Sequence, residues 1–285
     1  MLTDTAYEFR PKVSVFRMWL SAALVWLLIG GAAWAETFRF GIVPQFEPRR
    51  LAEIWTPILE ELEQRTGHEF QMVGSPEISE FERGFIDGAF DFAYMNPYHF
   101  LVASEAQDYY PIVRDRGRDL FGVLVVADDS DFQTVSDLQG RRIAFPSPNA
   151  LGAALLMRAD LDRIFNIDYE AHYVSTHSSA YLNVALGEMD AAGGVMATLN
   201  SMPPDIRDSL RIIYETTRVP PHPIVAHPRV APDIVESVRS ALLTIAENPD
   251  SAALLQQIPM QKAGPADADD YDILNTLQLK NYWVD

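Results

Sequence analysis

The chain contains no cysteine among its 285 residues. This absence excludes a disulfide framework, a thiol nucleophile and a thiolate metal site. It also excludes a lipid-modified cysteine as an anchor at the start of an exported protein. After the first 35 residues, no apolar run approaches the roughly 20 residues that a membrane-spanning helix needs.

Basic side chains are scarce as well. The chain has 22 lysines and arginines against 40 aspartates and glutamates, a net charge of −18. Such a field repels a polyphosphate backbone, so we expect no nucleic-acid partner. It also repels small anions at long range, so any anion would have to be captured by local donors.

The first 35 residues have the pattern of a secretory signal. Three basic residues precede a short apolar run over 18–29, and the segment ends in Ala33-Trp34-Ala35. A basic leader, an apolar core and an A-x-A ending predict cleavage after Ala35. A retained membrane anchor is the alternative, but the run is short for a span. We therefore expect 1–35 to be a signal peptide and the mature protein to be periplasmic.

From residue 37 onward, short apolar runs alternate with helical periodicity, which is typical of parallel sheets with crossover helices. Strands are predicted over 37–43, 69–73, 91–96, 112–113, 121–127, 141–145, 169–175, 190–195, 210–214 and 223–226. Helices are predicted over 51–66, 78–89, 98–106, 149–165, 177–189, 231–247, 251–258 and 268–279. A Pro-Ala-Asp-rich piece over 264–270 resembles a linker.

Two strand-like crossings, near 123–127 and 224–226, divide this pattern into two lobes. The first lobe is expected to comprise 36–125 and 226–285, and the second 126–225. Two crossings form a hinge around a cleft, where a small ligand commonly binds. In open α/β sheets the ligand lies beyond the carboxyl ends of strands, beside helix N-termini.

Several short motifs occur in an order that resembles the phosphonate-, phosphite- and phosphate-binding components of ABC transporters. They are Asn96-Pro97-Tyr98, the run over 138–145, Thr176-His177-Ser178-Ser179, the run over 187–192 and His222-Pro223-Ile224-Val225. The resemblance implies a type II periplasmic binding fold, α/β with two lobes joined by a two-strand hinge. It also implies a cleft that closes on a small oxyanion and one site in a monomer.

The resemblance also implies which residues hold the ligand. Family members use hydroxyls and backbone N–H groups at the helix start after Pro148, a histidine such as His177, and aromatic residues of the first lobe. Here the usual Ser/Thr cluster is replaced by Asn149-Ala150-Leu151-Gly152, which keeps the backbone donors and the helix dipole but not the hydroxyls.

The strand-to-helix junctions supply the candidate ligand-binding residues. His177 can donate to an anion from a ring nitrogen, although a helix-capping role is the alternative. Thr176 and Ser178 fit both capping and binding, and Tyr94 and Tyr98 fit both a polar wall and core packing. The complete predicted set is Gln45, Phe46, Tyr94, Asn96, Tyr98, Ser147, Asn149, Ala150, Thr176, His177, Ser178 and Met196.

No cofactor, metal or catalytic residue is predicted. The six histidines form no close pair on a predicted helix, and the nucleotide and nucleophile motifs are missing. Two functions stay open on sequence alone. The protein is either a solute-binding component that delivers its ligand to a membrane permease, or an accessory protein that presents its ligand to a membrane sensor kinase.

Overall fold

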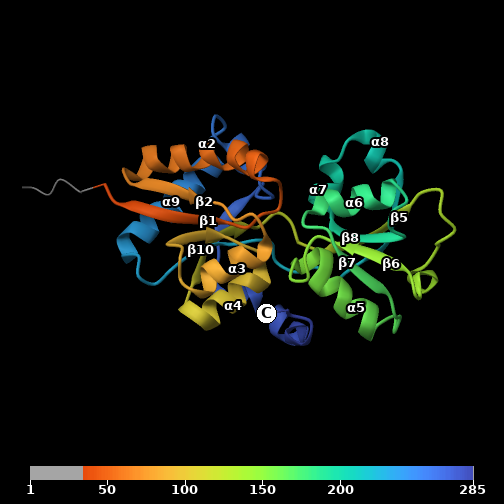
Figure 1. The fold of residues 1–285 in the computed structure, drawn as a ribbon. Coiled ribbons are helices and arrows are strands. Elements are labelled where there is room, and N and C mark those ends of the chain that lie inside the picture. The colour runs from red at the N-terminus through yellow and green to blue at the C-terminus, as the bar shows by residue number, and fades with distance from the viewer. Residues whose placement is uncertain (1–34, 285) are drawn as a thin grey trace, which may run out of the picture. The chain divides into compact units, whose positions relative to one another are not determined.

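The computed structural model describes residues 35–284, so the predicted signal segment lies outside the described residues apart from Ala35. From Glu36 onward the chain forms one compact unit, in which two β-sheets each carry their own helices (Figure 1). Within this part of the chain, no helix is long and apolar enough to cross a membrane.

The first sheet has six strands in the order β11-β4-β10-β3-β1-β2. Strands β1 (Thr37–Ile42), β2 (Glu69–Val73) and β3 (Phe92–Tyr94) are parallel, and β10 (Ile224–Ala226) runs antiparallel to β3 and β4 (Tyr110–Asp115). In Figure 1, helix α2 lies above this sheet and helices α3 and α4 lie below it. Their bounds are Pro48–Thr66, Ile78–Ile86 and Pro97–Gln107.

Helix α2 shows why the sequence folds this way locally. Its buried residues are those of the predicted apolar face: Leu51, Ile54, Trp55, Ile58, Leu59 and Leu62. The helix ends at Gly67, whose φ of 74° is a left-handed conformation that glycine adopts without strain. Its neighbour α9 (Pro232–Glu247) comes from the far end of the sequence and packs against it, followed by α10 (Ala252–Gln256).

The second sheet has five strands in the order β7-β6-β8-β5-β9. The strands are β5 (Gly122–Ala127), β6 (Arg142–Phe145), β7 (Glu170–Tyr173), β8 (Ala191–Val195) and β9 (Leu210–Glu215). The helices of this lobe are η1 (Val135–Leu138), η2 (Leu151–Leu156), α5 (Met157–Arg163), α6 (His177–Ala185), α7 (Met196–Ser201) and α8 (Pro204–Arg207). The predicted helix over 149–165 is therefore a π-helical turn, η2, that continues as α5.

The chain crosses between the two sheets over residues 116–121 and 216–223. The two crossing segments pair with each other: Leu120 N–H donates to the carbonyl of Val219 at 2.8 Å, and Val219 N–H donates back at 2.9 Å. All of β5 belongs to the second sheet, so the expected lobe boundary after residue 125 falls inside this strand. An apolar run alone could not distinguish the crossing from the strand that follows it.

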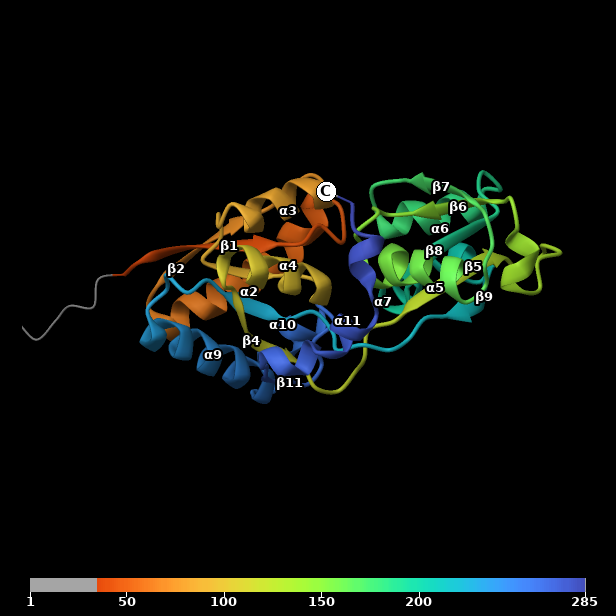
Figure 2. The same cartoon turned by 90° about the horizontal axis from the view of Figure 1, so that it is seen from below.

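The C-terminal region differs from its prediction. The piece over 264–270 is no linker, because β11 (Ala263–Pro265) pairs with β4 and the helical turn η3 (Ala268–Tyr271) follows. The predicted helix over 268–279 is divided into η3, α11 (Ile273–Thr276) and the start of η4 (Leu279–Asn281). Through β11 these residues join the sheet of the first lobe, and their last turn lies between the lobes in Figures 1 and 2.

Two glycines allow η2 to lie directly on the second sheet. A Cβ atom at Gly122 would be 1.9 Å from the carbonyl oxygen of Gly152, and one at Gly193 would be 2.0 Å from that of Ala153. Both neighbours are backbone atoms, which cannot move aside as a flexible side chain would. The small residues of β5 and β8 therefore fix where η2 begins.

We expect Gly122→Ala to lower the free energy of unfolding by about 3 kcal/mol, the upper part of the usual range for overpacking. The measurement is urea unfolding at neutral pH. Gly74→Ala is the matched control, because its Cβ would have only the end of Met72 nearby, at 4.0 Å. Equal stability of the two variants would contradict the packing described here.

Candidate functional site

A small cavity lies where the two lobes meet. Its volume is about 20 Å³, little more than the roughly 10–15 Å³ that a single water needs. We call it the inner chamber. Residues of both lobes line it: Val43, Gln45, Ile78, Asn96, Leu120, Ala150, Leu151, Gly152, His177, Val195 and His222.

Four helices begin beside the inner chamber. Asn96 precedes α4, Ala150 precedes η2, His177 opens α6, and Val195 precedes α7. The first N–H groups of a helix have no carbonyl partner within that helix, and its N-terminus carries a partial positive charge. The chamber therefore lies beside the positive ends of four helices, although no lysine or arginine lines it.

His177 lines the inner chamber with a buried side chain. Only 6% of its surface is accessible, and its Nδ1 atom has no hydrogen-bond partner among residues 35–284. Burial lowers the pKa of His177 to about 4, so the ring is neutral at neutral pH. A neutral imidazole has one N–H donor, and no group of the described chain competes for Nδ1 of this ring, whose residue lines the chamber.

A second histidine, His222, was not among the predicted ligand-binding residues. It is 8% exposed and lies at the end of the return crossing, in the motif His222-Pro223-Ile224-Val225 that supported the resemblance. Burial, and secondarily the nearby His99 and His177, lower its pKa to about 3. The Nε2 atoms of Gln45 and His222 are 3.0 Å apart. With the amide as donor, the imidazole proton lies on Nδ1.

The two predicted tyrosines lie behind or beside the chamber rather than in its wall. Tyr94 stacks on His222, with ring centroids 5.3 Å apart, and its hydroxyl has no partner within the described part of the chain. Burial raises the pKa of Tyr94. Tyr98 packs against Trp283 at 5.6 Å and lines a different surface groove.

Thr176 and Asn96 have capping roles. The Thr176 hydroxyl accepts a hydrogen bond from Ser179 N–H at 3.0 Å, and the Asn96 side chain accepts one from His99 N–H at 2.8 Å. Asn96 also donates from Nδ2 to the backbone oxygen of Asn149 at 3.3 Å, which joins the lobes. Ser178 lines none of the cavities described here.

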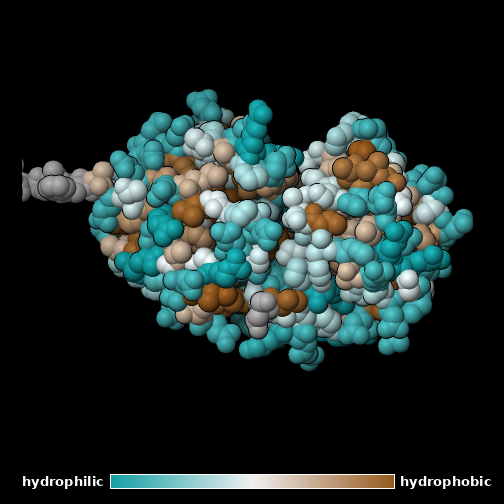
Figure 3. Space-filling model, in the orientation of Figure 1, coloured by the Kyte–Doolittle hydropathy of each residue, from teal (hydrophilic) through white to brown (hydrophobic). Residues whose placement is uncertain are grey.

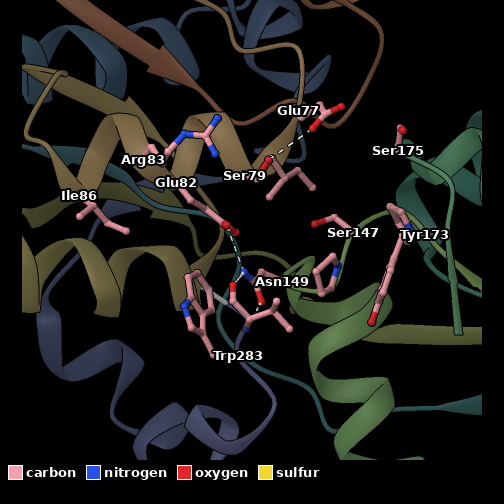
Figure 4. Close-up of a pocket in the computed structure, with 14 residues that line it drawn as sticks. Glu77, Ser79, Glu82, Arg83, Ile86, Ser147, Asn149, Tyr173, Ser175 and Trp283 are labelled. Carbon is pink, nitrogen blue, oxygen red and sulfur yellow. Dashed lines mark hydrogen bonds between the residues drawn. The ribbon is translucent and has the colours of Figure 1, made fainter.

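The side chain of Asn149 joins the two lobes and the C-terminal segment. Its Nδ2 donates to Glu82 Oε2 at 3.1 Å and to the Val284 carbonyl at 2.7 Å, and its Oδ1 accepts from Val284 N–H at 3.0 Å. Glu82 Oε1 is also 3.0 Å from Nε2 of His99. These contacts occupy the amide of Asn149 outside the inner chamber (Figure 4).

A larger space, the outer pocket, lies beside Asn149. Its volume is about 370 Å³, and Figure 4 shows helix α3 on one side, the second lobe on the other and Trp283 below. Ser147 lines this pocket rather than the inner chamber. The C-terminal segment forms part of its wall through Trp283 and Val284. This segment is held to the second lobe, because Arg158 Nη1 donates to the Tyr282 carbonyl at 2.9 Å and Arg163 Nη1 to the Leu277 carbonyl at 2.7 Å.

A third space, the hinge-side chamber, has a volume of about 210 Å³. Phe46 and Met196, both predicted from the sequence, lie in its wall together with Gln45 and His222. Between residues 35 and 284, no group of three histidine, aspartate or glutamate side chains is arranged to hold a metal ion. On the face drawn in Figure 3 the surface is mostly polar, with apolar residues in small separate groups.

Comparisons with known proteins agree with this architecture. Residues 40–271 match the family described as "ABC transporter, phosphonate, periplasmic substrate-binding protein". The chain is 22% identical over 240 residues to the phosphonates-binding periplasmic protein of Escherichia coli, covering 78% of this chain and 70% of that one. It is 20% identical over 227 residues to the phosphate-import protein PhnD of Mycolicibacterium smegmatis, covering 72% and 70%.

Solved structures show the same fold. A binding-protein component of an ABC phosphonate transporter from Pseudomonas aeruginosa superposes with a TM-score of 0.79 at 17% identity, covering 87% of this chain and 88% of that one. PhnD1 of Prochlorococcus marinus, solved with methylphosphonate, gives a TM-score of 0.79 at 15% identity, covering 87% and 99%. The predicted two-lobed α/β fold of the type II binding proteins is confirmed.

We expect Asn149→Ala to destabilise the protein without ligand by about 1–3 kcal/mol, because Glu82 would lose a buried hydrogen bond and Val284 would lose two. Thermal unfolding measures this effect. Asn183→Ala is the control, since that amide donates only to a carbonyl of its own helix, Ser179 O. If Asn149→Ala unfolded at the same temperature as the control, the amide would have no role in joining the lobes.

Stability should also depend on pH through His177. Its pKa is about 4 in the folded protein and about 6.5 when unfolded. Only the unfolded state therefore binds the proton between these values, and stability falls as the pH is lowered from 6.5 towards 4. The loss is on the order of 3 kcal/mol for this residue. In urea unfolding at pH 7, 6 and 5, His177→Gln should show a shallower decline than the wild type; parallel declines would contradict burial of a neutral ring.

Proposed function

This chain belongs to the family of periplasmic substrate-binding proteins of ABC phosphonate transporters, and we propose that its inner chamber binds the oxyanion group of a phosphonate-like solute. Members of this family are transport components and not enzymes, and they work in the periplasm. The permease of an ABC transporter is accordingly the expected partner, and nothing in the comparisons favours a sensor kinase.

The observation that carries the proposal is the donor set of the inner chamber. His177 offers a buried ring nitrogen without a partner, and the chamber adjoins the starts of four helices. No carboxylate lines the chamber, so a cation would find no counter-charge there. A site beside helix N-termini and free of carboxylates suits an oxyanion, which only accepts hydrogen bonds.

Other polar groups of the chamber can take the place of the hydroxyls that are absent at the start of η2. Ala150 and Leu151 contribute backbone groups only, while Gln45 and His222 add polar side chains from the opposite side of the chamber. We infer that these two residues replace the hydroxyl donors that the resemblance led us to expect. Because the protein is strongly acidic, these uncharged groups must hold the anion by short-range hydrogen bonds rather than by long-range attraction.

The predicted residues then take different roles. Gln45, Asn96, Ala150 and His177 are proposed as ligand contacts together with His222. Thr176 and Asn149 are proposed to position the helix starts and the lobes. We also propose that the signal peptide is removed after Ala35 and that the mature protein acts as a monomer with one site.

We expect His177→Ala to weaken binding of methylphosphonate by about 1.5–3 kcal/mol, the range for a hydrogen bond to a charged group. The measurement is isothermal titration calorimetry with the mature protein, residues 36–285, at pH 7.5. His172→Ala is the matched control, because this half-exposed histidine of β7 lines none of the three cavities.

The alternative outcomes are distinct. An unchanged affinity of His177→Ala with a lowered melting temperature would make His177 a structural residue. Absence of binding by the wild type to phosphate, phosphite and methylphosphonate alike would reject the oxyanion proposal.

A further inference from the structure

The size of the inner chamber limits what it can hold. At about 20 Å³ it has little more room than a single water needs, so it can hold no more of a ligand than its oxyanion group. An organic phosphonate consists of such a group, the oxyanion, joined to a substituent. The substituent of any organic ligand must therefore lie in a neighbouring space.

The walls of the cavities show which space this is. The outer pocket shares only Ile78 with the inner chamber. The hinge-side chamber shares four residues with it: Gln45, Leu120, Val195 and His222. A ligand whose oxyanion lies against His177 would thus extend towards the hinge.

The hinge-side chamber has polar and apolar residues where it meets the inner chamber, because it shares Gln45 and His222 as well as Leu120 and Val195. Leu120 and Val195 line both spaces, and Phe46, Phe121 and Met196 lie in the wall beyond them. Its volume of about 210 Å³ accommodates a small ring or a short alkyl chain. Transfer of such a group from water into this space favours binding.

The charges around this chamber disfavour an amino substituent. The guanidinium of Arg50 lies 4.0 Å from the ring centre of Phe46, and that of Arg218 lies 3.8 Å from the ring centre of Phe121. Each of these guanidinium groups already lies over one of the two rings, and Arg118 lines the chamber itself. An ammonium group would therefore meet positive charge here. Asp119 is the one carboxylate in the lining, and it is exposed to solvent.

We propose that the hinge-side chamber is a second subsite, which binds an uncharged apolar substituent. The ligand class is then alkyl- or arylphosphonates rather than inorganic phosphate or aminoalkylphosphonates. This inference rests on the function proposed above, since it assigns the oxyanion to the inner chamber.

Calorimetry of the mature protein with benzylphosphonate, methylphosphonate, 2-aminoethylphosphonate and inorganic phosphate tests the proposal. Benzylphosphonate should bind on the order of tenfold more tightly than methylphosphonate, because its ring leaves water. The aminoethyl compound should gain nothing over the methyl compound, because its ammonium group meets no buried counter-charge.

A substitution in the chamber wall locates the substituent. Ala197→Trp would fill the hinge-side chamber from an exposed position on α7 and should remove the preference for benzylphosphonate over methylphosphonate. Ala253→Trp is the matched control, an exposed helical alanine of α10 that lines none of the three cavities. It should keep the preference.

Each outcome has one meaning. If methylphosphonate or phosphate binds at least as tightly as benzylphosphonate, the second subsite is rejected and the oxyanion site stands. If benzylphosphonate is preferred but Ala197→Trp keeps the preference, the substituent lies elsewhere and the inference fails. If none of the four compounds binds, the proposed function itself is rejected.

Discussion

Burial of two imidazole rings where the lobes meet is the constraint on which the chemistry of this site depends. Removal of His177 and His222 from water lowers the pKa of each ring well below neutrality. The chamber between them is therefore polar without being charged. A neutral donor set binds an anion by hydrogen bonds that are strong only when the lobes exclude water. Under the proposed function, closure of the lobes and recognition of the ligand would therefore be the same event.

The rest of the structure keeps these rings in place. Close contact of η2 with β5 and β8, which Gly122 and Gly193 permit, fixes the first N–H groups of η2 beside His177. The crossing segments, which pair at Leu120 and Val219, place His222 in the wall of the same chamber as His177. Asn149 and the C-terminal segment add a further connection between the lobes, on the side away from the hinge-side chamber.

Much of this architecture was predictable because it depends on local patterns. Helical periodicity identified every buried residue of α2, and the position of His177 at a strand-to-helix junction identified a residue that lines the inner chamber. The strand β11 was missed because Ala263–Pro265 is short and contains the glycine and proline typical of turns. It is a strand only because β4 offers an unpaired edge.

Only part of the candidate site could be predicted from the sequence, because the partners of its side chains come from distant segments. A junction pattern shows which residues lie near a cleft but not which partners their side chains find. Asn149 was expected in the ligand site, whereas its amide is bonded to Glu82 and Val284, which are distant in the sequence. His222 appeared only as part of a crossing, and its part in the chamber follows from contacts with Gln45 and Tyr94, which sequence spacing does not reveal.

Nitrogen NMR of the histidine side chains would show whether the two buried imidazoles contact the ligand. The mature protein, labelled with ¹⁵N at its histidines, would be titrated with methylphosphonate at pH 7.5, and the signals assigned through single histidine variants. We expect the ring nitrogen signals of His177 and His222 to shift on binding and those of the surface residues His68 and His172 to stay unchanged. Binding that leaves both His177 and His222 unchanged would show that the oxyanion lies outside the inner chamber.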